Sequence, residues 1–370
     1  MIQPKPFWLK IRFSANPTFG AVNGLLEQQR LHTVCRSARC PNLGECWSRG
    51  TATFMIMGDV CTRNCRFCNV QPGAPLPLDP DEPRRVAEAA KSMNLRYVVV
   101  TSVTRDDLPD GGAAQFAAVV RELRRALPEA GVEILVPDFR NKPDLTSIAS
   151  GVFHLTHNTS QEKASDEEHP TQLISTNVAS GVFHLTHNTS QEKASDEEHP
   201  TQPISTNVAS GVFHLTQQVV EIIMQHPPDV LNHNIETVPR LYPEVRPRAD
   251  YHHSLNLLKA FAAAGLKTKS GLMVGMGETL NEIHKVLLDL RANDVKLLTI
   301  GQYLRPSAGH YPVERYVHPD EFAALAEYAL ALGFEHCASA PLVRSSYRAE
   351  EAVIKHNKSF KTGATIDNKS

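Results

Sequence analysis

Six of the seven cysteines lie in two groups of three within a short stretch near the N-terminus. The upstream group has the spacing C-x4-C-x5-C, and the downstream group has the spacing C-x3-C-x2-C. We call them the first trio and the second trio; their members are Cys35, Cys40 and Cys46, followed by Cys61, Cys65 and Cys68. Three thiolates hold three irons of a cubic iron–sulfur cluster and leave the fourth iron open to another ligand. Two such groups suggest two clusters with different tasks.

Zinc is the main alternative for both groups. Structural zinc sites usually pair C-x2-C knuckles and need four ligands, and no further Cys or His follows the second trio at a usual spacing. The first trio, by itself, is also compatible with a zinc knuckle that lacks one ligand. The odd total of seven cysteines, together with their clustered spacing, argues against a disulfide scaffold and favours metal binding in a reducing compartment, so a cytoplasmic location is expected.

Composition narrows the class of protein. The chain has 370 residues, of which 41% are hydrophobic and 21% are charged, and its net charge is −2. These values are typical of a globular protein with a large core, and they give no basic footprint for nucleic acid. The N-terminal stretch MIQPKPFWLKIRF lacks the apolar run of a secretory signal, and no apolar run approaches the roughly 18 residues that span a bilayer. We expect neither a nucleic-acid partner nor a membrane partner.

Downstream of the cysteines, strand and helix patterns alternate, which predicts a parallel α/β fold. The expected strands are 51–57, 97–102, 132–136, 230–235, 267–274 and 297–302. The expected helices are 83–93, one opened by Asp110-Gly111-Gly112 and stopped by Pro128, 218–225, 249–264, 278–292 and one that starts at Pro319. A further helix is expected near 21–30.

Six strands with intervening helices favour a partial (β/α)6 barrel similar to a TIM barrel, in which chemistry takes place in loops after the strand ends. The second trio occupies such a loop after the first strand. We therefore expect an N-terminal extension over 1–50, which carries the first trio, a barrel over 51–340, and a C-terminal tail over 341–370.

A tandem repeat interrupts the barrel over 149–216. The segment 149–178 recurs as 179–208 with one change, from Leu173 to Pro203, and a third partial copy, ASGVFHLT, ends at Thr216. Copies this similar indicate a recent duplication or an error in assembling the sequence. Because the repeat is polar and has too few copies for a solenoid, we expect a largely unstructured surface excursion.

Several long motifs resemble those of lipoyl synthases, in the right order and over nearly the whole chain apart from the repeat. They are HTVCRSARCPNLGECW (32–47), GDVCTRNCRFCNV (58–70), TSVTRDDLPDGG (101–112), LNHNIETVPRLYPEVRPRADY (231–251), GLMVGMGET (271–279) and PLVRSSYRAE (341–350). The second trio, with Phe67 directly before its last cysteine, is also similar to the signature of the radical S-adenosylmethionine (SAM) superfamily.

The resemblance implies a ligand set. The second trio would hold a 4Fe–4S cluster whose open iron binds SAM, and the first trio would hold an auxiliary 4Fe–4S cluster with a serine as fourth ligand. Ser346 is the expected ligand and Ser345 the fallback; the alternative for both is a local hydrogen bond to the backbone. Arg344 would orient that serine or the acyl amide of the substrate.

The implied reaction is the insertion of two sulfur atoms at C6 and C8 of an octanoyl chain. These C–H bonds have no acidic proton, so a general base cannot remove them, whereas a carbon radical derived from SAM can abstract a hydrogen atom. The auxiliary cluster would supply the sulfur and be consumed. A related enzyme that acts on a free small molecule, as biotin synthase does, and an electron-transfer or structural metal protein are the alternatives.

The implied partners are proteins. The octanoyl group would be attached to a lipoyl carrier domain of a 2-oxoacid dehydrogenase E2 subunit or to the glycine-cleavage H protein. An electron donor such as flavodoxin or ferredoxin and a carrier that repairs the auxiliary cluster are also expected.

Weaker candidates lie at the ends of expected strands. Thr101 and Ser102 would contact SAM by analogy with the family. Asn234 and Glu236 alternate with Asn232 on one face of a strand, which indicates either a ligand site or a hydrogen-bond network. The glycines Gly271, Gly275 and Gly277 give only weak support for a close cofactor, and Cys337 is expected to be a buried thiol.

Overall fold

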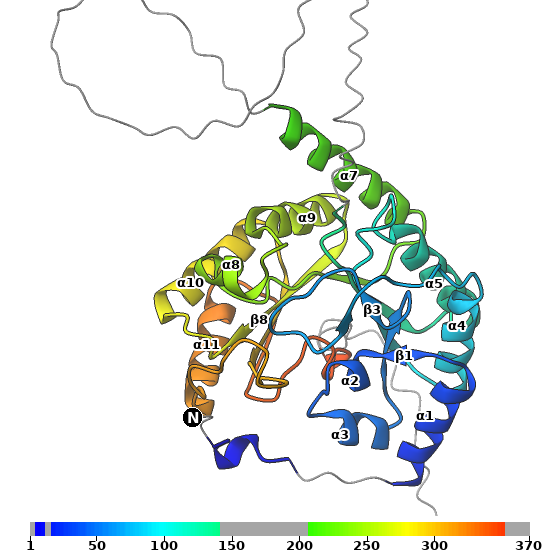
Figure 1. The fold of residues 1–370 in the computed structure, drawn as a ribbon, viewed down its shortest axis with the longest axis horizontal. Coiled ribbons are helices and arrows are strands. Elements are labelled where there is room, and N and C mark those ends of the chain that lie inside the picture. The colour runs from blue at the N-terminus through cyan, green and yellow to red at the C-terminus, as the bar shows by residue number, and fades with distance from the viewer. Residues whose placement is uncertain (1–3, 12–15, 141–205, 352–370) are drawn as a thin grey trace, which may run out of the picture. The chain divides into compact units, whose positions relative to one another are not determined.

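A computed structural model describes residues 4–11, 16–140 and 206–351, in which strands and helices alternate along the chain (Figure 1). The strands are β1 (His32–Thr33), β2 (Thr53–Ile56), β3 (Val60–Cys61), β4 (Gln71–Pro72), β5 (Tyr97–Ser102), β6 (Gly131–Leu135), β7 (Val230–Asn232), β8 (Lys267–Val274), β9 (Leu297–Gln302) and β10 (His336–Ser339). The helices are η1 (Phe7–Leu9), α1 (Pro17–Gln28), α2 (Val34–Ser37), α3 (Leu43–Ser48), α4 (Glu82–Ser92), α5 (Ala113–Ala126), α7 (Thr206–Met224), η2 (Pro239–Leu241), α8 (Tyr242–Val245), α9 (Tyr251–Ala263), α10 (Leu280–Ala292) and α11 (Pro319–Ala331).

Eight of these strands form one sheet in the order β1-β2-β5-β6-β7-β8-β9-β10. Every neighbouring pair from β2 to β10 is parallel, and β1 alone pairs antiparallel with β2. Among the described residues, the two edge strands β1 and β10 do not pair with each other, so hydrogen bonding leaves the sheet open. The α/β class and the mostly parallel sheet predicted from the sequence are therefore confirmed.

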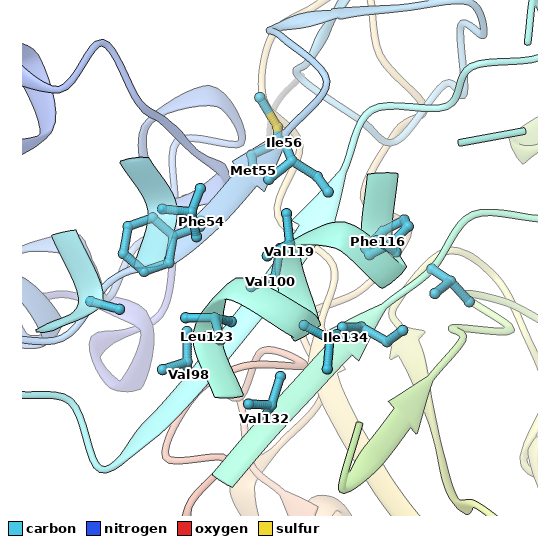
Figure 2. Close-up of a cluster of buried hydrophobic side chains, with 14 of the residues drawn as sticks. Phe54, Met55, Ile56, Val98, Val100, Phe116, Val119, Leu123, Val132 and Ile134 are labelled. Atoms are coloured by element: carbon cyan, nitrogen blue, oxygen red, sulfur yellow. The ribbon is translucent and has the colours of Figure 1, made fainter. Parts of the chain in front are cut away.

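One face of the sheet packs against helices, and every second side chain of each strand points to that face. In Figure 2, Phe54 and Ile56 of β2 and apolar residues of β5 and β6 belong to one buried cluster with α5, whose Phe116 and Leu123 have no exposed surface. Because side chains alternate along a strand, the intervening residues Thr53 and Met55 face the other way. The opposite face is thus free to carry polar groups.

Local signals fix several helix starts. Helix α11 begins at Pro319 with His318 as its N-cap, and α10 begins after Thr279, which forms a capping box with Glu282. Helix α1 begins at Pro17 rather than near residue 21, because the Asn16 side chain accepts a hydrogen bond from the Phe19 N–H and caps it there.

Three predictions need correction. The sheet contains the additional strand β10, whose sequence HCAS has no β-branched residue and no apolar alternation to reveal it. Strand β7 ends at Asn232 rather than residue 235, and Glu236 nearby has a φ of +67° that does not suit a regular strand. The third repeat copy, 209–216, lies within helix α7 and is not unstructured. Residues 149–205 of the repeat lie outside the described residues.

No helix within the described ranges is both long enough and apolar enough to cross a membrane.

Candidate functional site

A cavity of about 810 Å³ opens on the polar face of the sheet and brings together residues from distant parts of the sequence. Five of the six clustered cysteines line it, and so do Arg344, Ser345 and Ser346 near the C-terminus. Its wall also contains the residues predicted for SAM, which are Thr101, Ser102, Asn234 and Glu236. Cys46, the sixth cysteine, lies in α3 and does not line the cavity.

The second trio lies at the end of β3 and in the loop that follows it. The Cys68 N–H donates to the Cys65 carbonyl at 3.0 Å, which closes the loop into a tight turn. The sulfur of Cys61 accepts hydrogen bonds from the backbone N–H groups of Arg63 and Thr104, each at 3.4 Å. These two contacts hold the Cys61 sulfur in place at the end of β3.

The first trio is held by two short helices. Cys35 lies in α2 and Cys46 in α3, and the Cys40 N–H between them donates to the Cys35 carbonyl at 3.0 Å. Burial raises the pKa of all three thiols, and it raises that of Cys46 to about 12 with added contributions from the charges of Cys35 and Cys40. A bound metal cation reverses the effect, because a coordinating thiol is deprotonated outright.

The Arg344–Tyr347 segment follows β10 and is anchored in the cavity by both serines. The Ser345 hydroxyl accepts a hydrogen bond from Asn234 Nδ2 at 2.8 Å, and its carbonyl accepts one from the buried Lys269 Nζ at 2.7 Å. The Ser346 hydroxyl points elsewhere and accepts a hydrogen bond from Thr53 Oγ1 at 2.8 Å. Of the two hydroxyls, that of Ser346 is the one next to the first trio, because Thr53 also contacts Cys35.

A glycine makes room for this segment. A Cβ atom on Gly301 in β9 would collide with the backbone carbonyl of Val343, which cannot move aside as a flexible side chain can. We expect Gly301→Ala to displace the Arg344–Ser346 segment. The loop of the second trio, which is far from Gly301 in the sequence, should keep its conformation. Iron counted after anaerobic reconstitution should fall by up to about four atoms per chain, the content of one cubic cluster. Unchanged iron content would contradict this prediction.

Arg344 is a partly buried cation that lines the cavity. Its hydrogen bond within the described part of the chain goes to the Val343 carbonyl at 2.6 Å. Burial lowers the pKa of Arg344, and the nearby Cys40 and Glu236 oppose that shift. A guanidinium with free donors in a cavity is suited to a carboxylate or a carbonyl oxygen.

The four residues predicted to contact SAM differ in what they offer. The Thr101 hydroxyl already donates to the Leu135 carbonyl at 3.0 Å. Ser102 Oγ and Asn234 Oδ1 are buried without a hydrogen-bond partner in the described residues, which is costly unless a ligand supplies one. Burial raises the pKa of Glu236, although Arg246 and Asn234 act against that rise. Gly271 also lines the cavity, whereas Gly275 and Gly277 do not.

Sequence reasoning missed a network of buried charged residues that contacts the loop of the second trio through Arg63. Arg63 lies between two cysteines of this trio and donates to Asp106 at 2.7 and 2.8 Å and also to Asp138. Arg246 Nη2 donates to the other Asp138 oxygen at 3.3 Å, and His233 Nε2 lies 3.3 Å from it. Asp138 comes three residues after Leu135, the last residue of β6. Parallel barrels place functional residues after the carboxyl ends of their strands, and that position was the available signal.

These residues fit iron–sulfur clusters and SAM by their chemistry. All seven cysteines are free thiols, five of them share one cavity, and two unpartnered polar atoms face the same space. Within the described ranges, no three His, Cys, Asp or Glu side chains form a group that could hold a metal ion. The fit therefore rests on the donor set and the shared cavity.

Comparisons with known proteins agree with this chemistry. The family model described as "Radical SAM superfamily" matches residues 55–159 and 185–290. A lipoyl synthase of Chromobacterium violaceum is 44% identical over 348 residues, which cover 94% of this chain and 87% of the relative. A lipoyl synthase of Actinobacillus pleuropneumoniae serotype 5b is 46% identical over 94% of this chain and 84% of its own. The crystal structure of a methylornithine synthase aligns with a TM-score of 0.43 at 11% identity, over 89% of this chain and 84% of the other.

Proposed function

This chain belongs to the lipoyl synthase family of the radical SAM superfamily, and we propose that its two trios divide that family's reaction between two clusters in one cavity. The chain is a sulfurtransferase that uses SAM and 4Fe–4S clusters to insert two sulfur atoms, at C6 and C8, into a protein-bound octanoyl group. The observation that carries the division of labour is the cavity itself, because members of both trios and Ser346 line it.

The second trio holds the cluster that binds SAM. Bound in the cavity, SAM and the clusters supply the one-electron cleavage of a sulfonium and the sulfur atoms, while the chain supplies position. Ser102 and Asn234 offer the polar atoms that lack partners, and Glu236 offers a carboxylate to the amino group or ribose of SAM. Thr101 fixes the end of β5 through its bond to Leu135.

The first trio holds the auxiliary cluster, with Ser346 as the fourth ligand. The contact between Thr53 and the Ser346 hydroxyl supports this choice over Ser345, whose hydroxyl is engaged by Asn234. A serine oxygen is a hard ligand for a cluster iron and should leave more readily than a thiolate, which suits a cluster that is consumed. Arg344, beside Cys40, orients the serine or the acyl amide.

The substrate is an octanoylated lipoyl carrier domain. We propose that E2 subunits of 2-oxoacid dehydrogenases and the glycine-cleavage H protein both serve, with flavodoxin or ferredoxin as electron donor and a separate carrier that rebuilds the auxiliary cluster. The cytoplasm is the proposed location, since seven free thiols are best maintained in a reducing compartment.

The finer architecture is also a proposal. We infer a partial barrel of the radical SAM type over 51–340, whose sheet has seven parallel strands in the described residues, an extension over 1–50, a tail over 341–370 and a repeat insertion over 149–216. The match to the family model breaks off between 159 and 185, inside the repeat, which supports an insertion there.

Replacing Ser346 with alanine tests the assignment of the two clusters. We expect Ser346→Ala to cleave SAM at a rate close to that of the parent protein, because the second trio is intact, and to form no lipoyl product on an octanoylated carrier. Ser345→Ala is the matched variant and should retain most product formation. Product and 5′-deoxyadenosine are measured together under anaerobic conditions. Unimpaired lipoyl formation by Ser346→Ala would refute its role as a ligand.

A further inference from the structure

Thr53 lies between the two kinds of ligand proposed for the auxiliary cluster. It is the first residue of β2, its side chain is 6% exposed, and it lines the cavity together with Cys35 and Ser346. Its hydroxyl donates to Ser346 Oγ at 2.8 Å, across a separation of 293 residues. Thr53 also interacts with Cys35 of the first trio, which lines the same cavity.

Other residues hold the polar groups of the chain just before Ser346, so within the described residues Thr53 contacts the Ser346 hydroxyl alone among the oxygens of this segment. Lys269 and Asn234 hold the carbonyl and the hydroxyl of Ser345, and Asn42 Nδ2 donates to the Leu342 carbonyl at 2.7 Å. The segment is therefore fixed at Leu342 and at Ser345, directly before Ser346. Thr53 supplies the hydrogen bond to the Ser346 hydroxyl in the described part of the chain.

We propose that Thr53 is a positioning residue for the fourth ligand of the auxiliary cluster, where it holds the Ser346 oxygen beside Cys35 and donates a hydrogen bond to it. A threonine hydroxyl has one proton to donate, and an oxygen that carries negative charge is a much better acceptor than a sulfur. When Ser346 is a metal ligand, the proton of Thr53 therefore stays on the serine oxygen. The hydrogen bond strengthens as that oxygen gains charge, so Thr53 sets how readily the serine leaves the iron.

This inference rests on the proposed function, because it needs a cluster at the first trio. The test uses the full-length chain carrying Cys61→Ala, Cys65→Ala and Cys68→Ala, so that bound iron reports only on the first trio. Iron is counted after anaerobic reconstitution, and its release to a chelator is followed by the loss of visible absorbance. About four iron atoms per chain are expected in this parent.

We expect Thr53→Val, which keeps the shape and removes the hydroxyl, to accelerate iron release about tenfold, since a hydrogen bond to a charged acceptor is lost. Thr53→Ala should behave alike if the valine variant folds poorly, and Thr53→Ser should restore slow release. Thr268→Val is the matched control, because it removes another buried strand hydroxyl, one that donates to the Asp294 carbonyl at 3.2 Å away from the cavity.

A double-mutant comparison separates a contact with Ser346 from a structural effect. In a Ser346→Ala background there is no serine oxygen to hold, so Thr53→Val should change iron release little. An equal acceleration in both backgrounds would overturn the proposal, because Thr53 would then act through Cys35 or the fold. Unchanged release in the parent background would overturn it too. A parent that binds no iron would instead remove the proposed function, and the inference with it.

Discussion

Cys65→Ala is expected to abolish SAM cleavage and lipoyl formation together. Cys65 is the central ligand of the second trio, and without it two thiols remain to hold a cubic cluster that already leaves one iron open. The variant should lose about four of the iron atoms bound after reconstitution and keep those of the first trio. The measurements are iron per chain, 5′-deoxyadenosine and thiolated carrier from one anaerobic preparation.

The chain offers a matched control for this substitution. Cys337→Ala removes the one cysteine outside the two trios, which lies in β10 and does not line the cavity. Iron content and both products should match those of the parent. If Cys65→Ala still cleaved SAM, or if Cys337→Ala lost iron to the same degree, the assignment of the second trio would be wrong.

The parts that sequence reasoning predicted well carry their signal locally. Strands 97–102, 267–274 and 297–302 have the predicted bounds, because each lies between two helical patterns, and 97–102 and 297–302 are also short and mostly apolar. The cysteine trios could also be recognised, since each trio spans 12 positions or fewer in the sequence. Spacing of that kind needs no knowledge of the fold.

The contacts that complete the site are not local, and this is why sequence reasoning missed them. Thr53 meets Ser346 over 293 positions, and Lys269 reaches the Ser345 carbonyl over 76 positions. Isolated Lys, Arg and Asp residues in a sequence are usually solvated, so nothing marks Lys269 or Asp138 as buried. Only the register of the parallel strands brings such groups to the same end of the sheet.

The buried network around Asp138 gives the second large expected effect, on stability. Asp138 is 1% exposed and faces Arg63, Arg246 and His233. Asp138→Asn should lower the free energy of unfolding by about 3–5 kcal/mol, because the loss of one buried partner leaves the other charges uncompensated. Urea unfolding of the metal-free protein measures the change. Asp294→Asn, which breaks an exposed pair with Lys296, should cost less than about 1 kcal/mol.

The difference in the free energy of unfolding between the parent and Asp138→Asn should depend on pH, and this dependence is a sharper test than the magnitude of the difference. Burial alone would raise the pKa of Asp138, but Arg246, His233 and Arg63 together hold it well below the usual 3.8. A carboxyl whose pKa is lowered in the folded state contributes stability above its unfolded pKa and loses it as the pH falls through its folded pKa. The gap between the parent and Asp138→Asn should therefore stay constant from about pH 5 to pH 8 and shrink only below about pH 4. A gap that closed between pH 5 and pH 8 would mean that Asp138 is not held ionised by these cations. Arg63, in the loop of the second trio, would then keep Asp106 as its charged partner.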